Sequence, residues 1–203
     1  MSLRDDLIVA ALSFFALFLI LGLIVSRRPL GSFDARAVYF RSQATSLALV
    51  FTKSGRSRAL FAGYVIAIIV FALARLPIWI PVFLAASQII SQLIVESLKL
   101  LYGRTRPDYW LVGLDAGHSY PSGHATTAIV SFVGWALVIA VSALPPALKY
   151  ILVALFVLWA VGIVWSRLAL GAHYLSDVVG GLLFGCAWMC ALVVLTMNSG
   201  LVR

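Results

Sequence analysis

Charged residues are scarce in this sequence, and acidic residues are scarcer than basic ones. Only 11% of the 203 residues are Asp, Glu, Lys or Arg, whereas 63% are hydrophobic. A soluble domain of this size does not need so much apolar surface, so the composition excludes a soluble protein and indicates an integral membrane protein. The seven acidic residues also include no paired carboxylates at the spacing of a divalent metal site.

Cysteine is nearly absent as well. Cys186 and Cys190 are the only two cysteines, and they lie four residues apart in an apolar run. They lack the His or Cys companions that a metal site requires, so we interpret them as small buried hydrophobic residues. The sequence therefore predicts no bound metal.

The few charged residues are mostly basic. Fifteen Lys and Arg against seven Asp and Glu give a formal net charge of +8. Such an excess also occurs in nucleic-acid-binding proteins, but sparse charge among aromatic-rich apolar runs favours anionic lipid as the partner. We therefore expect no nucleic acid partner, and we interpret the basic residues as contacts to phosphates and lipid headgroups.

Long apolar runs divide the chain into six predicted membrane spans, which predicts an all-α transmembrane bundle with both termini on one side. The expected spans cover residues 7–25, 59–76, 78–101, 123–142, 148–165 and 175–197. Residues 32–51 have apolar positions at helical spacing, which predicts an amphipathic interfacial helix, or alternatively a lid over a site. We expect residues 1–203 to form a single membrane-embedded domain.

The third predicted span is polar in its second half. Gln88, Gln92, Glu96 and Lys99 are spaced four, four and three residues apart, so they share one helical face. A polar face cannot contact lipid cheaply, which predicts that it faces the bundle interior. Gln88 and Gln92 either line a site or form interhelical hydrogen bonds only.

Two further patterns concern packing. Gly181 and Gly185 in the last span have the spacing of a close-packing helix face. In the loop over residues 102–121, Tyr109, Trp110 and Tyr120 are expected to be aromatic anchors at the membrane interface.

Three polar clusters lie at the ends of predicted spans, at residues 99–107, 121–124 and 166–177. Counting through six spans puts all three clusters on the same membrane face. For the cluster at residues 166–177 alone, a snorkelling arginine beside an interfacial histidine and a nearby helix cap is an adequate structural explanation. Independent structural features would scatter over both faces, however, and charge at membrane depth is usually functional. We therefore expect the three clusters to form one site.

The clusters have the composition of a phosphate site. Lys99, Arg106 and Arg167 offer cationic donors, and arginine guanidinium groups match phosphoryl oxygens two at a time. Ser122 has the position of an N-cap and Gly123 allows close backbone approach, so the fourth span would point its first N–H groups at an anion. Charge neutralisation, positioning and proton management are what phosphoryl transfer requires.

Two histidines make the expected chemistry more specific. His173 and Asp177 are four residues apart, so the carboxylate can hold one imidazole nitrogen and aim the other outward. In this arrangement His173 attacks phosphorus to form a phosphohistidine, and His124 donates a proton to the leaving oxygen and later activates water. The two roles require opposite protonation states, which predicts a bell-shaped pH profile.

The patterns Lys-x6-Arg-Pro, Pro-Ser-Gly-His and Ser-Arg-x5-His-x3-Asp resemble the tripartite signature of the type 2 phosphatidic acid phosphatases, also called lipid phosphate phosphatases. This resemblance implies a metal-independent phosphatase without a cofactor, with His173 as nucleophile, Asp177 as its partner and His124 as the acid. It also implies a set of phosphate-binding residues: Lys99, Arg106, Ser122, Gly123 and Arg167. Soluble acid phosphatases and vanadium haloperoxidases share the signature, but the hydropathy of this chain excludes them.

The expected substrate is a phosphate monoester or pyrophosphate on a membrane lipid. Phosphatidic acid, phosphatidylglycerophosphate, polyprenyl pyrophosphate and a lipid A phosphate all fit, and the sequence indicates neither a choice among them nor an oligomeric state. A small transporter or flippase is an alternative, but it predicts polar residues through several spans, and four of the spans have almost none. A catalytically silent lipid-phosphate-binding relative is a second alternative, against which the intact His124, His173 and Asp177 argue.

Two arguments about orientation disagree. The expected site face carries seven basic residues in the first loop, against four on the other face. The positive-inside rule would therefore place the site in the cytoplasm. Membrane members of the family resemble one another in facing the extracytoplasmic side, and an interfacial helix gives these bases another role, in binding anionic headgroups. We expect a prokaryotic plasma membrane with the site on its extracytoplasmic side.

Other polar residues near the clusters have less specific expectations. Glu96 is one helical turn from Lys99 and is expected to neutralise or orient it. Arg104 and Asp108 either steer substrate or pair with each other. His118 is expected to have an ordinary interfacial role.

Overall fold

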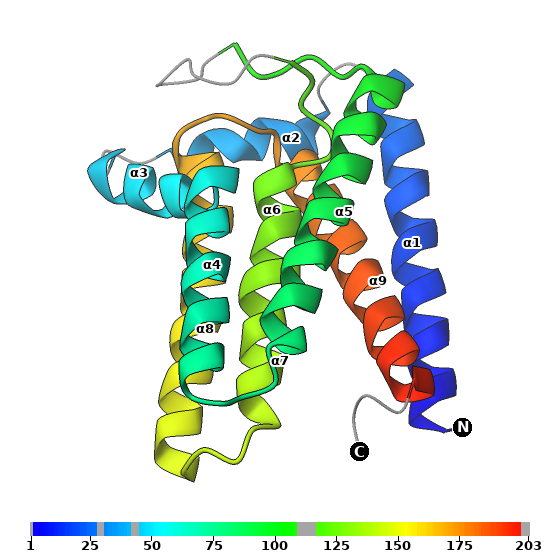
Figure 1. Ribbon diagram of the computed structural model, residues 1–203. Helices are drawn as coiled ribbons and strands as arrows, with labels where there is room; N and C mark the ends of the chain where they lie inside the picture. The colour runs from blue at the N-terminus through cyan, green and yellow to red at the C-terminus, as the bar shows by residue number, and fades with distance from the viewer. Residues whose placement is uncertain (1, 28–30, 42–44, 109–116, 200–203) are drawn as a thin grey trace.

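The computed structural model describes residues 2–27, 31–41, 45–108 and 117–199, and these contain helices but no β-strand. Seven elements run roughly along the bundle axis (Figure 1): α1 (Leu3–Arg27), α4 (Ser57–Leu73), α5 (Trp79–Tyr102), α6 (Gly123–Thr127), α7 (Gly134–Ala140), α8 (Pro146–Ala169) and α9 (Leu175–Ser199). A π-helical stretch, η2 (Ala128–Val133), joins α6 to α7. The predicted all-α class is confirmed.

Within the described residues, five segments are long and apolar enough to cross a membrane: Leu3–Ser26, Trp79–Tyr102, Gly123–Ala140, Pro146–Ala169 and Leu175–Met197. A sixth crossing arises if α3 (Thr45–Ser54) and α4 count as one span bent by 56°. Helix α4 alone has 17 residues, or about 26 Å at 1.5 Å per residue. Five or six spans agree with the predicted bundle.

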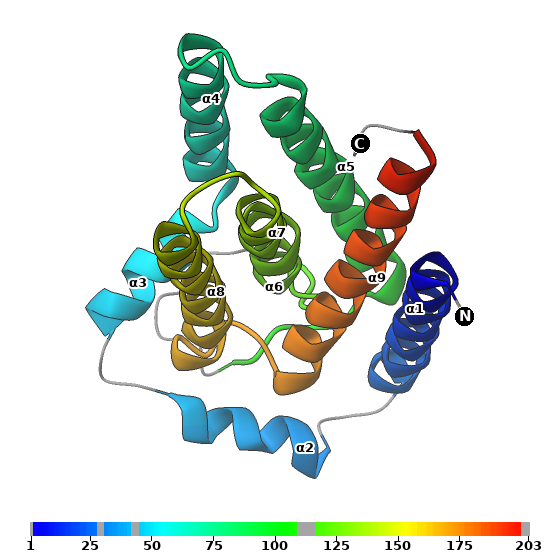
Figure 2. The same cartoon turned by 90° about the horizontal axis from the view of Figure 1, so that it is seen from below.

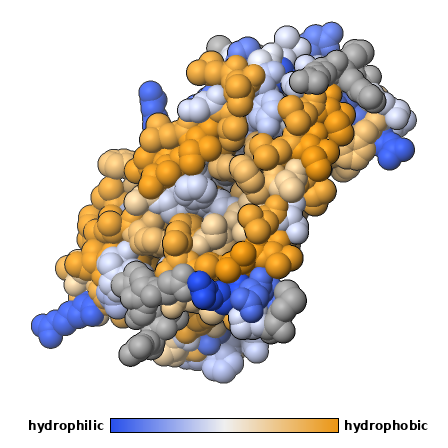
Figure 3. All heavy atoms as spheres, turned by 90° about the vertical axis from the view of Figure 1, so that its right-hand side faces the viewer, coloured by the Kyte–Doolittle hydropathy of each residue, from blue (hydrophilic) through white to orange (hydrophobic). Residues whose placement is uncertain are grey.

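The surface of the bundle is suited to lipid. Figure 3 shows a face on which apolar side chains form a broad field. Large apolar residues such as Leu12, Leu73 and Leu155 are more than half exposed. An apolar surface of this extent marks contact with a membrane rather than with water.

The three sequence clusters lie at one end of this bundle. Helix α5 ends there, α6 begins there, and the turn from α8 to α9 is at the same end (Figure 1). The chain's N-terminus, the turn before α5 and the turn before α8 lie at the opposite end. The up-and-down path of the spans therefore brings together segments that are far apart in the sequence.

The segment expected to form one amphipathic helix over residues 32–51 is divided in the structure. Its parts are α2 (Ser32–Ala35), the 3-10 helix η1 (Arg36–Phe40), which ends where Arg41 becomes extended, and α3. Figure 2 shows these parts passing around the outside of the bundle. Ala37 packs against Leu168 and Val178, whereas Ala48 packs against Ala169 and Leu170. A straight helix of 20 residues is about 30 Å long and could not follow this curved path.

Close contacts along α9 confirm the predicted glycine face. A Cβ atom on Gly181 would lie 2.4 Å from the carbonyl oxygen of Ser122, and one on Gly185 would lie 2.8 Å from Cβ of Ile129. The absent side chains therefore let α9 approach α6 and η2 closely. Cys186 and Cys190, expected to be buried, are only partly buried.

Tyr120 is a core residue, whereas the sequence predicted an interface anchor; Tyr109 and Trp110 lie outside the described residues. The Tyr120 ring is fully buried and stacks on Phe18, with ring centroids 5.7 Å apart. Its hydroxyl donates to the Phe18 carbonyl oxygen at 2.8 Å, and burial raises the pKa of Tyr120. The ring fits because Gly180 has no side chain, since a Cβ there would lie 2.4 Å from the ring.

We expect Gly181→Ala to destabilise the protein by about 1–3 kcal/mol, because the new methyl group would overlap the Ser122 backbone. Thermal unfolding in detergent micelles would measure the change. Gly63→Ala is the matched control, since a Cβ at Gly63 meets no atom within 4 Å. A helix-interior alanine at that site should be neutral or stabilising by up to about 1 kcal/mol. Equal melting temperatures for the two variants would contradict the close packing of α9.

Candidate functional site

A cavity of about 590 Å³ lies at the end of the bundle where the three clusters meet. Six of the eight predicted site residues line it: Lys99, Arg106, Gly123, His124, Arg167 and His173. The other two, Ser122 and Asp177, are fully buried and contact each other through the Ser122 N–H, which donates to the Asp177 carbonyl oxygen at 3.0 Å. The structure thus brings all eight predicted residues to one place.

Lys99 reaches the cavity from the last turn of α5. Its ammonium donates to Glu96 at 2.6 Å, which is the pairing expected from the sequence. A Cβ on Gly123 would lie 3.7 Å from Lys99 Nζ, so the ammonium is close to the start of α6. The absence of a side chain at Gly123 keeps this space open.

The polar face of α5 holds that helix against α6 and η2. Gln88 donates to Thr127 at 2.8 Å and accepts from Ser131 at 2.9 Å. Gln92 donates to the Gly123 carbonyl oxygen and to Thr127, and it also lines the cavity. The predicted interior orientation is therefore confirmed for both glutamines, and their interhelical hydrogen bonds fix α5 beside the start of α6.

Ser122 is the N-cap of α6, as predicted. Its hydroxyl oxygen accepts from the Ala125 N–H at 3.4 Å, and its backbone is in the extended region. This cap begins the helix immediately before Gly123 and His124, so both residues come to the cavity wall on its first turn.

His173 is held between a carboxylate and an arginine. Its Nδ1 lies 3.4 Å from Asp177 Oδ2, and its Nε2 lies 3.3 Å from Arg106 Nη1. An ionised carboxylate only accepts and a guanidinium only donates, so both neighbours favour the neutral tautomer with its proton on Nδ1. The lone pair of Nε2 is then on the side of the ring that faces Arg106.

His124 contacts a residue that the sequence did not indicate. Its Nε2 is 3.0 Å from the carbonyl oxygen of Thr52, which can only accept, so Nε2 carries a proton. The hydroxyl of Thr52 accepts from Arg167 Nη1. Thr52 is 2% exposed and joins two predicted site residues from helix α3. Its only sequence signal was its position four residues after Ala48, immediately after the predicted amphipathic segment.

Arg104 pairs with two carboxylates, neither of which is Asp108. It donates to Asp177 and Asp34, each at 2.5 Å, and to the Ser176 hydroxyl at 2.7 Å. Burial lowers the pKa of Arg104, but the charges of Asp177 and Asp34 outweigh this and raise it above its ordinary value. Of the two alternatives left open for Arg104 and Asp108, the structure does not support a pair between them, because Arg104 pairs with Asp34 and Asp177 instead. Asp34 was missed because an acidic residue in an amphipathic segment is usually exposed to solvent.

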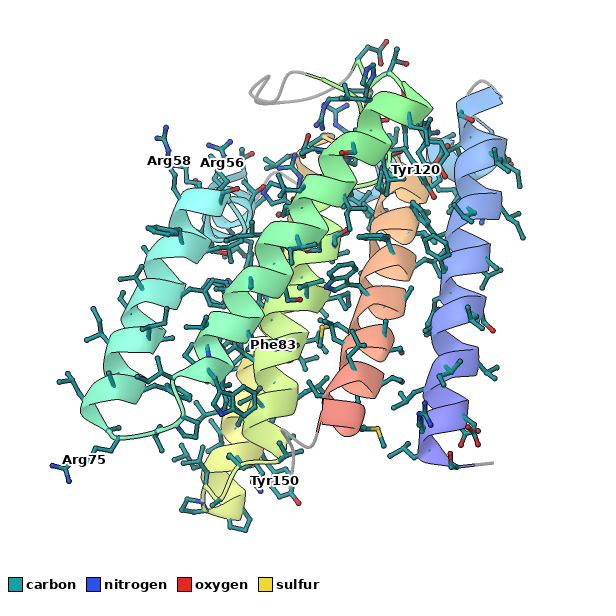
Figure 4. The ribbon with its side chains drawn as sticks, turned by 45° about the vertical axis from the view of Figure 1, so that its right-hand side comes forward. Arg56, Arg58, Arg75, Phe83, Tyr120 and Tyr150 are labelled. Atoms are coloured by element: carbon teal, nitrogen blue, oxygen red, sulfur yellow. The ribbon has the colours of Figure 1, made fainter. Side chains whose placement is uncertain are left out.

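The cavity is strongly cationic. Among the described lining residues, one is a carboxylate, Glu96, and five are basic: Arg56, Arg58, Lys99, Arg106 and Arg167. Arg56 is the N-cap of α4 and Arg58 lies in its first turn, and both lie at the site end of the bundle in Figure 4, opposite Arg75. Clustered cations of this kind attract anions. No group of three or more His, Cys, Asp or Glu within the described residues is arranged to hold a metal ion.

Comparisons with known proteins agree on one family. The family model of the PAP2 superfamily matches residues 80–200. The lipid A 1-phosphatase of Rhizobium johnstonii is 33% identical over 127 residues, which are 58% of this chain and 48% of that protein. Phosphatidylglycerophosphatase B of Escherichia coli K12 is 38% identical over 65 residues, which are 32% of this chain and 24% of that protein. The match thus spans about half the length of the rhizobial relative.

A solved structure has the same fold. The transmembrane PAP2 type phosphatidylglycerolphosphate phosphatase from Bacillus subtilis superposes with a TM-score of 0.78 at 25% sequence identity. The superposition covers 95% of this chain and 98% of that chain. The similarity therefore extends beyond residues 80–200.

We expect the cavity to bind orthovanadate or inorganic phosphate through its cations, and to lose about tenfold in affinity in Lys99→Gln, equivalent to about 1.4 kcal/mol. The ligand-induced rise in melting temperature would measure binding. Arg75→Gln removes a similar charge at the opposite end of the bundle and should bind the anion normally. Equal affinities for the wild-type protein and Lys99→Gln would show that the anion does not contact Lys99.

Proposed function

Because the chain belongs to the PAP2 superfamily, we propose that it hydrolyses a phosphate monoester or pyrophosphate carried by a membrane lipid, through a phosphohistidine intermediate. The observation that carries this proposal is that six of the eight predicted site residues line one cationic cavity and the other two, Ser122 and Asp177, are buried beside it. The hydrogen bonds that fix His173 support its assignment as nucleophile, because they favour the tautomer that presents a lone pair on Nε2.

In the first step, His173 Nε2 attacks phosphorus, a P–N bond forms, and the bond from phosphorus to the leaving oxygen breaks. His124 in its protonated form gives a proton to that oxygen. Asp177 stabilises the positive charge on the His173 ring through Nδ1. In the second step, His124 takes a proton from water as the water oxygen attacks phosphorus, and the P–N bond breaks to release inorganic phosphate.

The cations of the cavity neutralise the phosphoryl oxygens during both steps. Arg106 is next to His173 Nε2, and Lys99 is close to the start of α6. Thr52 holds Arg167, and all three cations line the same cavity as His173. Preorganised donors around the reacting group are usually the main source of rate enhancement in such reactions.

A second cavity supports a lipid substrate. It has a volume of about 370 Å³ and is lined mainly by apolar residues of α4, η2, α7 and α8. Thr127 lines the cationic cavity and Ser131, one helical turn along the same span, lines the apolar one. A lipid headgroup in the first cavity could therefore extend an acyl or prenyl chain into the second. The names of two relatives, lipid A 1-phosphatase and phosphatidylglycerophosphatase B, indicate substrates that carry both a phosphate group and acyl chains.

We expect the purified protein to release phosphate from at least one of phosphatidic acid, phosphatidylglycerophosphate, a polyprenyl pyrophosphate or a lipid A phosphate, also in the presence of a chelator. His173→Ala should lower kcat/KM by about 1,000-fold or more, equivalent to about 4 kcal/mol, because the attacking atom is lost. A malachite-green assay of released phosphate would measure the activity of the wild-type protein and of His173→Ala.

His118→Ala is the matched control for that substitution, since His118 is a half-buried loop histidine that is not among the described lining residues of the cavity. It should retain activity within about threefold. Full activity in His173→Ala would refute the nucleophile assignment. A wild-type protein that releases no phosphate from any of these lipids would instead favour a lipid-phosphate-binding relative.

The chain is an integral membrane protein, and we propose that its site faces the extracytoplasmic side of a prokaryotic plasma membrane. The basic residues at the site end support this orientation only if they contact headgroups, because the positive-inside rule taken alone predicts the reverse. Cysteine introduced at Lys53 should react with an impermeant maleimide on intact cells, and cysteine at Lys149 should not. The opposite pattern would place the site in the cytoplasm.

A further inference from the structure

The carboxylate that holds His173 is itself held by several donors. Asp177 Oδ2 accepts from the Tyr174 N–H at 3.0 Å and faces His173 Nδ1 at 3.4 Å. Asp177 Oδ1 accepts from Arg104 at 2.5 Å and faces the Ser119 hydroxyl at 3.4 Å. The contact with Arg104 is much shorter than the contact with His173. The position of the carboxylate is therefore set mainly by Arg104 and the Tyr174 backbone.

Arg104 is fixed in turn by Asp34 on helix α2. The second amino group of Arg104 donates to Asp34 Oδ2 at 2.5 Å. The other oxygen of Asp34 accepts from the N–H and the hydroxyl of Ser176, at 2.9 and 2.6 Å. The guanidinium also lies over the Tyr174 ring, 4.5 Å from its centroid. Arg104 thus bonds to two carboxylates through the two terminal nitrogens of its planar guanidinium. A shorter side chain, or one with a single donor nitrogen, could not make both bonds.

Burial makes this set of charges interdependent. The exposed fractions are 5% for Asp34, 8% for Arg104 and 0% for Asp177. A buried carboxylate is costly unless a partner compensates its charge, and one guanidinium here serves two carboxylates. Removal of the guanidinium would leave two buried carboxylates facing each other. Asp177 would then turn away or take up a proton, and in either case it could not hold Nδ1 of His173 as an anion.

Residues 104–106, which follow α5, act on both sides of the His173 ring. Arg104 reaches the Nδ1 side through Asp177, and Arg106 contacts Nε2 directly. Asp34, which anchors this stretch, lies outside residues 80–200, the part of the chain that the family model matches. Helix α2 is therefore connected to the reacting imidazole through two ion pairs.

We propose that Arg104, fixed by Asp34, is a positioning residue that holds Asp177 in place and in its ionised form, so that Asp177 can orient His173. This inference rests on the proposed function, because it assigns a role in the reaction of His173. Arg104 is not among the described residues that line the cavity, so its guanidinium is not placed to bind the phosphoryl group. Its loss should therefore slow the chemical step without weakening the binding of a phosphate mimic.

Wild-type protein, Arg104→Gln, Arg104→Lys and Asp34→Asn would be compared by kcat, KM and the affinity for inorganic phosphate. Arg104→Gln should lower kcat by about 100-fold, with KM and the affinity for inorganic phosphate changed by less than about threefold. Arg104→Lys keeps the charge but cannot reach both carboxylates, and should recover part of the loss. Arg36→Gln, an exposed arginine two residues from Asp34, is the matched control and should match wild type.

Coupling between Asp34 and Arg104 gives a separate test. Asp34→Asn alone should lower kcat by about tenfold, and Asp34→Asn combined with Arg104→Gln should be no slower than Arg104→Gln, because both act through Asp177. If kcat of the double variant falls by the product of the two single-variant factors, Asp34 acts independently of Arg104, contrary to the proposal.

The outcomes separate this inference from the proposed function. Wild-type protein without activity on any lipid phosphate would overturn the proposed function. Active wild type together with kcat within threefold of it in Arg104→Gln would overturn the positioning role alone. A lower kcat together with a raised KM and weaker binding of inorganic phosphate would assign Arg104 a general structural role, which also contradicts the proposal. If Arg104→Gln does not fold, unchanged kcat in both Arg104→Lys and Asp34→Asn would be equally decisive.

Discussion

The cost of placing charge at membrane depth is the constraint on which the rest of this structure depends. Ionised groups are expensive there unless they are paired, hydrogen-bonded or exposed to a water-filled space. In this protein the basic residues Lys99, Arg106 and Arg167 line one cavity, and Arg104 is enclosed between two carboxylates. The charged site and the buried ion pairs therefore lie at the same end of an otherwise apolar bundle.

Small residues and capped helix ends make this concentration of charge possible. The glycines of α9 allow it to approach α6 so closely that the Ser122 N–H reaches the Asp177 carbonyl oxygen. The segment of α2, η1 and α3 encloses the same end from outside and supplies Asp34 and Thr52. The site is thus built by packing as much as by its charged residues.

The sequence predicted the fold class, the polar face of α5 and the glycine face of α9, because each depends on local spacing or composition. It also predicted which eight residues meet, since their positions follow from counting spans and from the family resemblance. Asp34 and Thr52 could not be predicted in this way. Asp34 is 142 residues from its partner Ser176. Neither Asp34 nor Thr52 belongs to one of the three motifs. Tyr120 was misassigned because its burial depends on the missing side chain of Gly180, a tertiary contact that no local pattern indicates.

The central claim is that three distant segments form one site in which His173 is the attacking group. Alkaline quenching of the enzyme during turnover of a 32P-labelled lipid phosphate, followed by peptide mass spectrometry, tests it most directly. The account predicts a phosphoryl group on His173, present in wild-type protein and absent from His173→Ala. A phosphoryl group on another residue, or rapid turnover with no phosphorylated enzyme at any quench time, would contradict it.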